Sequence, residues 1–493
     1  MTPFWRRIGW VVTALLFAAG CASPSRANVP SAGEDSTAVQ KVILAQPAGE
    51  EEELKLKPVD PITLEDLPGY KPVRAGTHFD RAVSPDGGKL ALVAWPSSDF
   101  EEGVLRIIDL KRWEERTADF TLRGPVEGFA FASDGETLYW LMPDREDPSL
   151  GLPGEFGLYH FGLRDRKPTR IARLPRSFEP REMVILAGGD LAVYGVIKEK
   201  ENRGGRVYTF DPMSGNIRSQ VSLKGVKDET VHLTGQADPP VIESHKPAIA
   251  WDLRKEMLYI VGGEPERVIQ VDLGQGKVIR NQTVRYRSPL WEKIFYRLFP
   301  EAEAKWMSGT FRHAQLSPDG RRLFVTGRKD DVVEDSGEWT QKSEYFGLGV
   351  IDLETFEGRR LDLDAEMIKL SPDGGRLLLA GPWSEERGDQ GPEKRGGLVI
   401  VDAERIRVLG RLGSGVNFEP VGFSPDVRHA YVMTGEGVKV LDLETRRILS
   451  ERDGVELLII EQRRYPSTKG PRFHRFPLKR ARESGDDFRL DST

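Results

Sequence analysis

Short runs of four to six apolar residues alternate with polar turns along most of the chain. Many of these runs follow a Ser-Pro-Asp-Gly turn or a shortened form of it. Proline fixes one backbone torsion, aspartate caps a bend and glycine supplies a positive φ, so each turn favours a tight hairpin. The runs have the length and the Val, Ile, Leu and Tyr content of β-strands. The turns are Ser84-Pro85-Asp86-Gly87, Ser133-Asp134-Gly135, Ser317-Pro318-Asp319-Gly320, Ser371-Pro372-Asp373-Gly374 and Ser424-Pro425-Asp426.

A second apolar run in each repeat ends in an acidic turn, as in Ile107-Ile108-Asp109-Leu110, and a further short run follows. Each repeat therefore predicts four short antiparallel strands, and the fold class is all-β, a single β-propeller. The Leu457–Ile460 run, or the segment near 67–75, is interpreted as completing a neighbouring blade, with an eighth, degenerate blade as the alternative. The seven predicted blades centre on 79–122, 127–174, 183–223, 248–280, 311–363, 367–412 and 420–450.

These repeats resemble the β-propeller repeats of the YVTN and WD40-like type. Such repeats occur in TolB-like proteins, lactonase-like proteins and amine dehydrogenase heavy chains. The resemblance covers about residues 76–460. It implies a fold and no particular activity, because the shared motif is a turn.

The N-terminal segment has the pattern of an export signal. Arg6 and Arg7 precede an uncharged stretch, Ile8–Gly20, which suits the apolar core of a signal peptide. The chain's single cysteine, Cys21, follows Ala18-Ala19-Gly20 and resembles the lipidation site of bacterial lipoproteins, although that family usually has leucine where Ala18 stands. We therefore expect lipidation at Cys21 and location in the bacterial cell envelope, facing the periplasm or exterior. An ordinary secretory signal is the alternative.

Composition sets the remaining domain boundaries. We expect a signal peptide at 1–20, a lipidated flexible tether at 21–60 rich in Ser, Ala, Pro and Glu, and the propeller at 61–462. The segment 463–482 has eight basic residues and no acid. We therefore predict that 463–493 is a disordered basic tail, which could contact anionic lipid, cell-wall polymer or the acidic face of the propeller.

Cysteine content and charge exclude several classes of function. One cysteine among 493 residues cannot form an internal disulfide or a multi-cysteine metal site. A formal net charge of −6 argues against nucleic acid as a partner. No His/Cys metal spacing, nucleophile elbow or phosphate-binding loop occurs in the sequence, so we expect no metal, no cofactor of the chain's own and no confident catalytic residue.

The longest connections between predicted strands all fall at the end of the ring opposite the Ser-Pro-Asp-Gly turns. Elaborated loops on one face of a rigid scaffold usually carry binding. Near 285–307, Trp291 begins a helical apolar spacing that predicts a short amphipathic helix, which packs on the ring or docks a partner. The five connections between second and third strands contain 19 acidic and 9 basic residues, and they are 96–103, 143–157, 198–205, 329–346 and 383–397.

Propeller ligand sites form where the innermost strands reach the channel mouth, so positions four to seven residues before each turn are candidates. Acids and imidazoles there could support binding or acid–base chemistry, although ordinary polar lining of a wet channel is the simpler interpretation. The candidate channel-mouth residues are His78, Asp80, Arg81, Glu127, Arg312, His313, Glu366 and Glu419.

Two main functions remain open on this basis, and a TolB-like role in envelope organisation is a third, weaker option. The first is an envelope lipoprotein, anchored in the lipid bilayer, whose acidic, loop-rich face binds an envelope protein or a small ligand. The second is a propeller enzyme or enzyme subunit, such as a lactonase-like hydrolase or a dehydrogenase heavy chain. The first agrees better with the missing catalytic motifs.

Overall fold

A computed structural model gives the architecture of the chain. Within the residues that it describes, no helix is long and apolar enough to cross a membrane. The described residues are 42–47, 53–96, 102–143, 155–165, 167–197, 204–226, 228–233, 241–263, 266–286, 305–335, 338–381, 397–413, 416–455 and 457–460.

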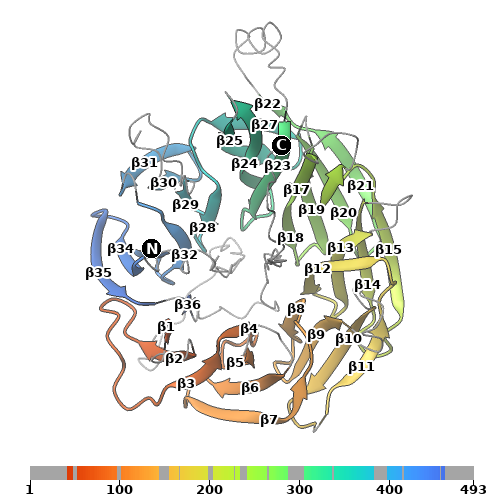
Figure 1. The fold of residues 1–493 in the computed structure, drawn as a ribbon, viewed down its shortest axis with the longest axis vertical. Coiled ribbons are helices and arrows are strands. Elements are labelled where there is room, and N and C mark those ends of the chain that lie inside the picture. The colour runs from red at the N-terminus through yellow and green to blue at the C-terminus, as the bar shows by residue number, and fades with distance from the viewer. Residues whose placement is uncertain are drawn as a thin grey trace, which may run out of the picture.

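The strands form sheets arranged around a central axis (Figure 1). Seven sheets are four-stranded and antiparallel, so the all-β propeller predicted from the sequence is confirmed. In six of these sheets the first strand along the chain lies nearest the axis. Three of them are β4 (His78–Val83) to β5 (Lys89–Trp95), β6 (Gly103–Asp109) and β7 (Glu114–Leu122); β8 (Gly128–Phe131) to β9 (Thr137–Pro143), β10 (Phe156–Gly162) and β11 (Thr169–Arg173); and β12 (Phe178–Ile185) to β13 (Leu191–Ile197), β14 (Gly204–Phe210) and β15 (Ile217–Leu223).

Three further four-stranded sheets follow the same order from the axis outward. They are β18 (Ala248–Asp252) to β19 (Met257–Gly262), β20 (Arg267–Asp272) and β21 (Lys277–Thr283); β28 (Met367–Leu370) to β29 (Arg376–Ala380), β30 (Leu398–Asp402) and β31 (Arg407–Leu412); and β32 (Glu419–Phe423) to β33 (His429–Met433), β34 (Gly437–Asp442) and β35 (Arg447–Asp453).

The remaining four-stranded sheet, the closing blade, joins the two ends of the described chain. Its order is β36 (Leu457–Ile460), β1 (Val42–Pro47), β2 (Leu54–Val59) and β3 (Val73–Gly76), with Val42 opposite Ile460. The alternative of a further unit containing Leu457–Ile460 is therefore realised. The tether predicted for 21–60 is wrong over β1 and β2, because Val42, Ile43, Leu44 and Ala45 have no exposed surface and pack into this sheet's two interfaces.

One sheet is larger, with eight strands, and contains the fifth predicted blade, 311–363. Its blade portion is β23 (Lys305–Leu316), β24 (Arg322–Asp335), β26 (Leu348–Asp352) and β27 (Glu357–Leu361), beside which β22 (Arg285–Tyr286) runs parallel to β27. β16 (Glu229–Leu233), β17 (Val241–Lys246) and β25 (Glu338–Tyr345) enlarge it. We call β16, β17 and β25, with the paired ends 305–311 of β23 and 328–335 of β24, the arm.

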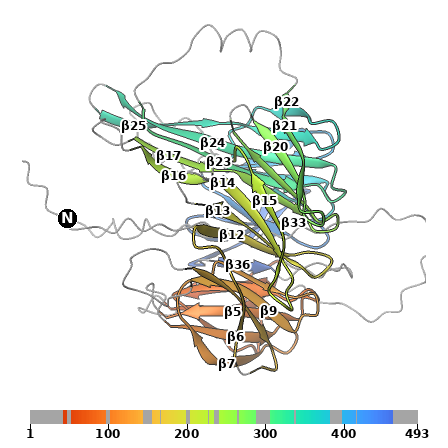
Figure 2. The same cartoon turned by 90° about the vertical axis from the view of Figure 1, so that its right-hand side faces the viewer.

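The arm extends past the other sheets at one end of the ring (Figure 2). The long loop predicted for 329–346 is thus wrong, because β24 continues and folds back as β25 in antiparallel register from Arg328–Tyr345 to Asp335–Glu338. The connection between the predicted blades 248–280 and 311–363 is also shorter than that spacing indicates, because β21 extends to Thr283, β22 follows it and β23 begins at Lys305. The predicted helix near 285–307 falls mostly on 287–304, outside the described residues.

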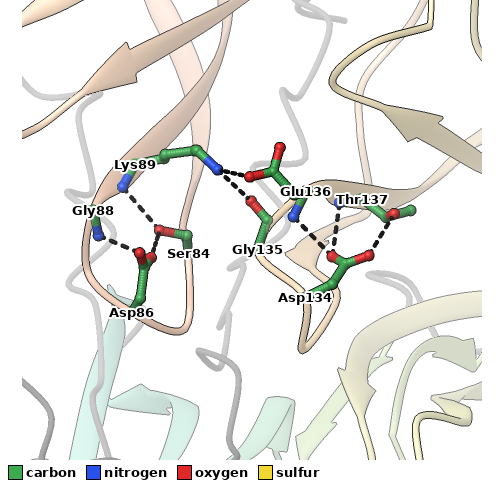
Figure 3. Close-up of polar contacts among 8 residues, drawn as sticks. All are labelled: Ser84, Asp86, Gly88, Lys89, Asp134, Gly135, Glu136 and Thr137. Atoms are coloured by element: carbon green, nitrogen blue, oxygen red, sulfur yellow. Dashed lines mark hydrogen bonds and ion pairs between the residues drawn. The ribbon is translucent and has the colours of Figure 1, made fainter.

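The hairpin turns have the hydrogen bonding that their sequence favours. Ser84 Oγ donates to Asp86 Oδ1 at 2.5 Å, and the same carboxylate oxygen accepts the Gly88 amide at 3.0 Å, while Gly87 has φ of 69°. The pattern recurs at Ser317, Ser371 and Ser424. Lys89 then joins the next blade's turn, donating to the Gly135 carbonyl at 3.0 Å and pairing with Glu136 (Figure 3).

Two faces of the ring follow from this topology. The turn face bears the Ser-Pro-Asp-Gly turns, and the elaborated face bears the connections between second and third strands and the arm. Eight hydrophobic clusters hold the ring together, each formed between two neighbouring sheets, including one on either side of the closing blade. Since burial of apolar surface drives folding, the closing blade is part of the ring's core.

Candidate binding face

The candidate residues of the channel mouth lie on the innermost strand of their sheet or directly before it (Figure 1). Each such strand starts at the elaborated face. Whether they bind anything stays a prediction. His78, Asp80 and Arg81 are in β4, Glu127 precedes β8, Arg312 and His313 are in β23, Glu366 precedes β28, and Glu419 begins β32.

Arg328 fastens the base of the arm to the ring. Its Nε lies 2.8 Å from Asp330 Oδ2, and its Nη1 lies 2.7 Å from Glu366 Oε2. Ser343 of β25 donates to the other oxygen of Asp330 at 2.7 Å, and Thr326 donates to the Glu366 backbone carbonyl at 2.6 Å. One candidate residue, Glu366, therefore meets the arm through a charge-assisted contact.

A second group of buried polar side chains lies nearby, on β12, β13 and the connection that leads to the arm. Trp251 Nε1 donates to Glu182 Oε2 at 2.5 Å, and the Tyr194 hydroxyl donates to Asp228 Oδ2 at 2.8 Å. Glu182 and Asp228 are only 6% and 8% exposed. Lys246, the last residue of β17, interacts electrostatically with both carboxylates and with Glu366.

The charges of these groups depend on one another. Burial raises the pKa of Asp228 and of Glu366, while nearby Arg181 and Arg328 respectively oppose the shift. Burial also lowers the pKa of Lys246 to about 8, against the attraction of Glu182, Asp228 and Glu366. Desolvation disfavours each charged form and the opposite charges favour it, so the protonation of each of these groups depends on the others.

Two more cations are buried on innermost strands. Lys369 in β28 is 3% exposed, and burial lowers its pKa to about 7 although Glu419 of the next blade opposes the shift. Arg81 in β4 is 7% exposed, and burial lowers its pKa to about 9 against the attraction of Asp80. Lys369 is not among the sequence-based candidates, because it stands two residues before its turn and the candidates were taken four to seven residues before each turn.

Arg312 does not stand in the channel mouth as the sequence analysis expected. It is 3% exposed and forms an ion pair with Glu266, which precedes β20 in the neighbouring blade. Its guanidinium carbon lies 4.2 Å from the centre of the Phe346 ring. Tyr286 donates its hydroxyl to Glu266 as well. The side chain is directed toward the preceding blade because alternate residues of a strand point to opposite faces of the sheet.

The two candidate histidines lie on different parts of the ring. His78 begins β4 opposite Trp95, and His313 lies in β23 opposite Thr326. Both are half-buried. Their blades are not neighbours, since β4 packs beside the closing blade and the β8 blade, whereas β23 packs beside the β18 and β28 blades. The two histidines therefore lie on blades that share no hydrophobic interface.

The described residues contain no group of three His, Cys, Asp or Glu side chains placed to hold a metal ion. What the face offers is a network of fixed charges at the channel mouth beside a projecting sheet.

Sequence reasoning missed Glu182, Asp228, Lys246 and Arg328. Glu182 lies four residues before the Leu186–Asp190 turn of its blade, so the same counting rule would have found it had that turn been recognised without its serine and proline. No comparable sequence pattern marks Asp228, Lys246 and Arg328, because it is the strand pairing of the arm that brings them to the channel mouth.

No protein-family model matches this chain. No curated protein matches it either. Several solved structures are similar in fold. A eukaryotic initiation factor is 12% identical, with 86% of this chain and 99% of that chain covered and a TM-score of 0.46. The Dos1 propeller is 11% identical, with 77% and 86% covered and a TM-score of 0.43. Hydrazine synthase of Kuenenia stuttgartiensis is 13% identical, with 73% and 94% covered and a TM-score of 0.38.

Proposed function

We propose that this chain is a cell-envelope lipoprotein whose propeller is a binding scaffold, with the elaborated face as its binding surface. The arm is the observation that carries the proposal. Strands of one blade continue beyond the ring and recruit β16, β17 and β25 into one extended sheet (Figure 2). A rigid scaffold that positions an elaborated surface is the usual arrangement of a recognition module.

The arm is fixed in place by the ring. Parallel pairing joins β17 to β23 from Ile242–Met307 to Lys246–Phe311, and Arg328 joins Asp330 to Glu366 at the base. A sheet held in this way loses little conformational freedom on binding, which favours affinity. The acidic excess of the connections on this face favours a partner with a basic surface.

Neutralising the arm's tip tests this proposal. The triple change Glu334→Gln, Asp335→Asn and Glu338→Gln is expected to reduce recovery of an envelope partner at least about tenfold, since the attraction between these acidic side chains and a basic partner is lost while the backbone pairing stays. The measurement is quantitative cross-linking and affinity capture from envelopes at low and high salt.

A matched control removes three acids from the turn face. Glu354, Glu404 and Glu444 are exposed, and each follows a turn aspartate by two residues. Their replacement by glutamine is expected to leave partner recovery unchanged. Equal recovery of the partner by the arm variant and the control contradicts the proposed binding scaffold. Turnover of a lactone or an amine that vanishes in a His78→Ala, His313→Ala variant also contradicts it and favours an enzyme.

The anchor is tested separately. Cys21→Ser is expected to move the protein from the membrane fraction to the soluble fraction, because the thiol is the only cysteine available to accept a lipid. Fractionation follows a wash in about 0.5 M salt, which screens purely ionic attachment. Ser23→Ala is the control and should stay in the membrane. Retention of the Cys21→Ser protein after that wash refutes lipidation.

A further inference from the structure

We propose that Arg81 binds the carboxylate of a small organic ligand at the seam, the hydrophobic interface between the β4 sheet and the closing blade. The guanidinium donates two hydrogen bonds to that carboxylate, and the ligand enters along the axis of the ring. This inference goes beyond the binding scaffold proposed above, because it concerns the axis of the ring and depends on neither the arm nor the anchor.

The register of β4 directs the Arg81 side chain into the seam. Arg81 lies opposite Leu92 of β5, and directly opposite residues of an antiparallel pair point to the same face of the sheet. Leu92 belongs to the hydrophobic cluster of the seam, as does Val83, and Phe79 packs against that cluster. Ala82, in contrast, packs into the cluster that the β4 sheet shares with the β8 sheet. The guanidinium therefore enters an interface formed largely by apolar side chains.

Among the residues that the structure describes, no side chain or carbonyl forms an ion pair or a hydrogen bond with this arginine. Arg81 is 7% exposed, and its Nε is buried and has no hydrogen-bond partner. Its guanidinium carbon lies 5.6 Å from the centre of the Phe79 ring. Buried polar groups are almost always hydrogen-bonded, and a guanidinium has five N–H donors. These donors therefore indicate an acceptor that the described part of the chain does not supply.

The strands on either side of the seam do not balance this charge. Asp80 attracts Arg81 electrostatically, yet burial still lowers the pKa of Arg81 to about 9. Because successive residues of a strand alternate between the two faces, Asp80 points to the opposite side of the sheet. The strand of the closing blade nearest the axis, β36, has the sequence Leu-Leu-Ile-Ile and brings no carboxylate to the seam. An anion bound at Arg81 offsets the cost of burying its charge.

The chemistry of this position selects a monocarboxylate. The planar guanidinium matches a carboxylate through two parallel hydrogen bonds. Ser84 donates its amide to the Lys89 carbonyl at 2.9 Å, and alternate residues of an antiparallel strand make such bonds, so the Arg81 amide points away from β5 and toward the axis (Figure 1). It adds a donor on the side from which a ligand reaches β4. A phosphate dianion would leave a buried negative charge near Asp80, whereas a monoanion neutralises the arginine.

Titration calorimetry of the full chain with acetate, butyrate and inorganic phosphate, at constant ionic strength, tests the site. We expect wild type to bind both carboxylates, butyrate more tightly because the seam is apolar, and to bind phosphate at least about tenfold more weakly. Arg81→Met should weaken carboxylate binding at least about tenfold, and Arg81→Lys should keep part of it, because lysine retains the charge without the planar fork. Arg112→Met is the control, since Arg112 is exposed on the turn face and should leave binding unchanged.

Thermal unfolding separates binding from a purely structural role. Saturating butyrate should raise the Tm of wild type and of Arg112→Met by about 2 °C or more, and it should leave the Tm of Arg81→Met unchanged. Equal responses of wild type and Arg81→Met overturn the proposal. So does the absence of saturable carboxylate binding by wild type up to about 100 mM, and so does phosphate binding as tight as that of the carboxylates. If Arg81→Met does not fold, carboxylate binding by Arg81→Lys as tight as that of wild type overturns the proposal in the same way.

Discussion

Replacing Glu266 with alanine is expected to lower the free energy of unfolding by about 3–5 kcal/mol. Glu266 is 6% exposed in its side chain and faces Arg312, which is 3% exposed, across the boundary between two blades. Removing the carboxylate leaves the Arg312 guanidinium as a buried charge without its ion-pair partner. It also removes the acceptor of the Tyr286 hydroxyl.

Two control variants separate the buried pair from a general charge effect. Arg360 approaches the same carboxylate at 3.8 Å but is 43% exposed, so Arg360→Gln should cost about 1 kcal/mol or less. The double change Glu266→Leu, Arg312→Met removes both charges and should recover most of the loss, since buried ion pairs are often replaceable by apolar side chains. Urea unfolding measures all of them. A Glu266→Ala loss no larger than that of Arg360→Gln contradicts the expected buried coupling.

Replacing Lys369 with methionine is expected to stabilise the protein by about 2–4 kcal/mol near pH 6. Burial lowers the pKa of this lysine from 10.5 to about 7 in the folded state. Below pH 7 the ammonium is charged in both states and the folded state bears the desolvation cost. Between pH 7 and about 10 folding releases a proton, so wild-type stability rises with pH.

The variant should lose this dependence. Its advantage over wild type is therefore largest at pH 6 and declines as the pH approaches 10, which unfolding curves at several pH values will show. Lys255→Met is the control, because its side chain is 52% exposed and its removal should change little at any pH. A Lys369→Met protein that is less stable than wild type at pH 6 means that the Glu419 interaction outweighs burial.

The ring could be predicted because its signal is local. The Ser84 and Asp86 side chains bond to the amides of their own turn, so the same four residues make the same hairpin wherever they occur. The acidic turns behave alike, since Asp109 caps the Lys111 and Arg112 amides. Spacing from these turns then placed most candidate residues on the innermost strands.

The closing blade and the arm could not be predicted in this way. β1 and β2 lie among Pro- and Glu-rich residues, and their partner β36 is at the other end of the fold. Residues 329–346 are rich in charged side chains, which favours a loop. In the structure they form the end of β24 and the whole of β25, which pair with each other, and β24 also pairs with β23. The partners of Arg312, Arg328 and Lys246 were missed for the same reason, because packing between blades selects them.

The closing blade also sets the order of events when the chain is made. β1 emerges early, while the strand that covers its inner edge, β36, is synthesised about 400 residues later, which takes roughly 20–80 s. Throughout that time the ring is open and β1 presents an unpaired edge of the kind that nucleates aggregation. Because β36 supplies the partner of that edge, we expect the ring to become resistant to proteases only after the last strand has been synthesised.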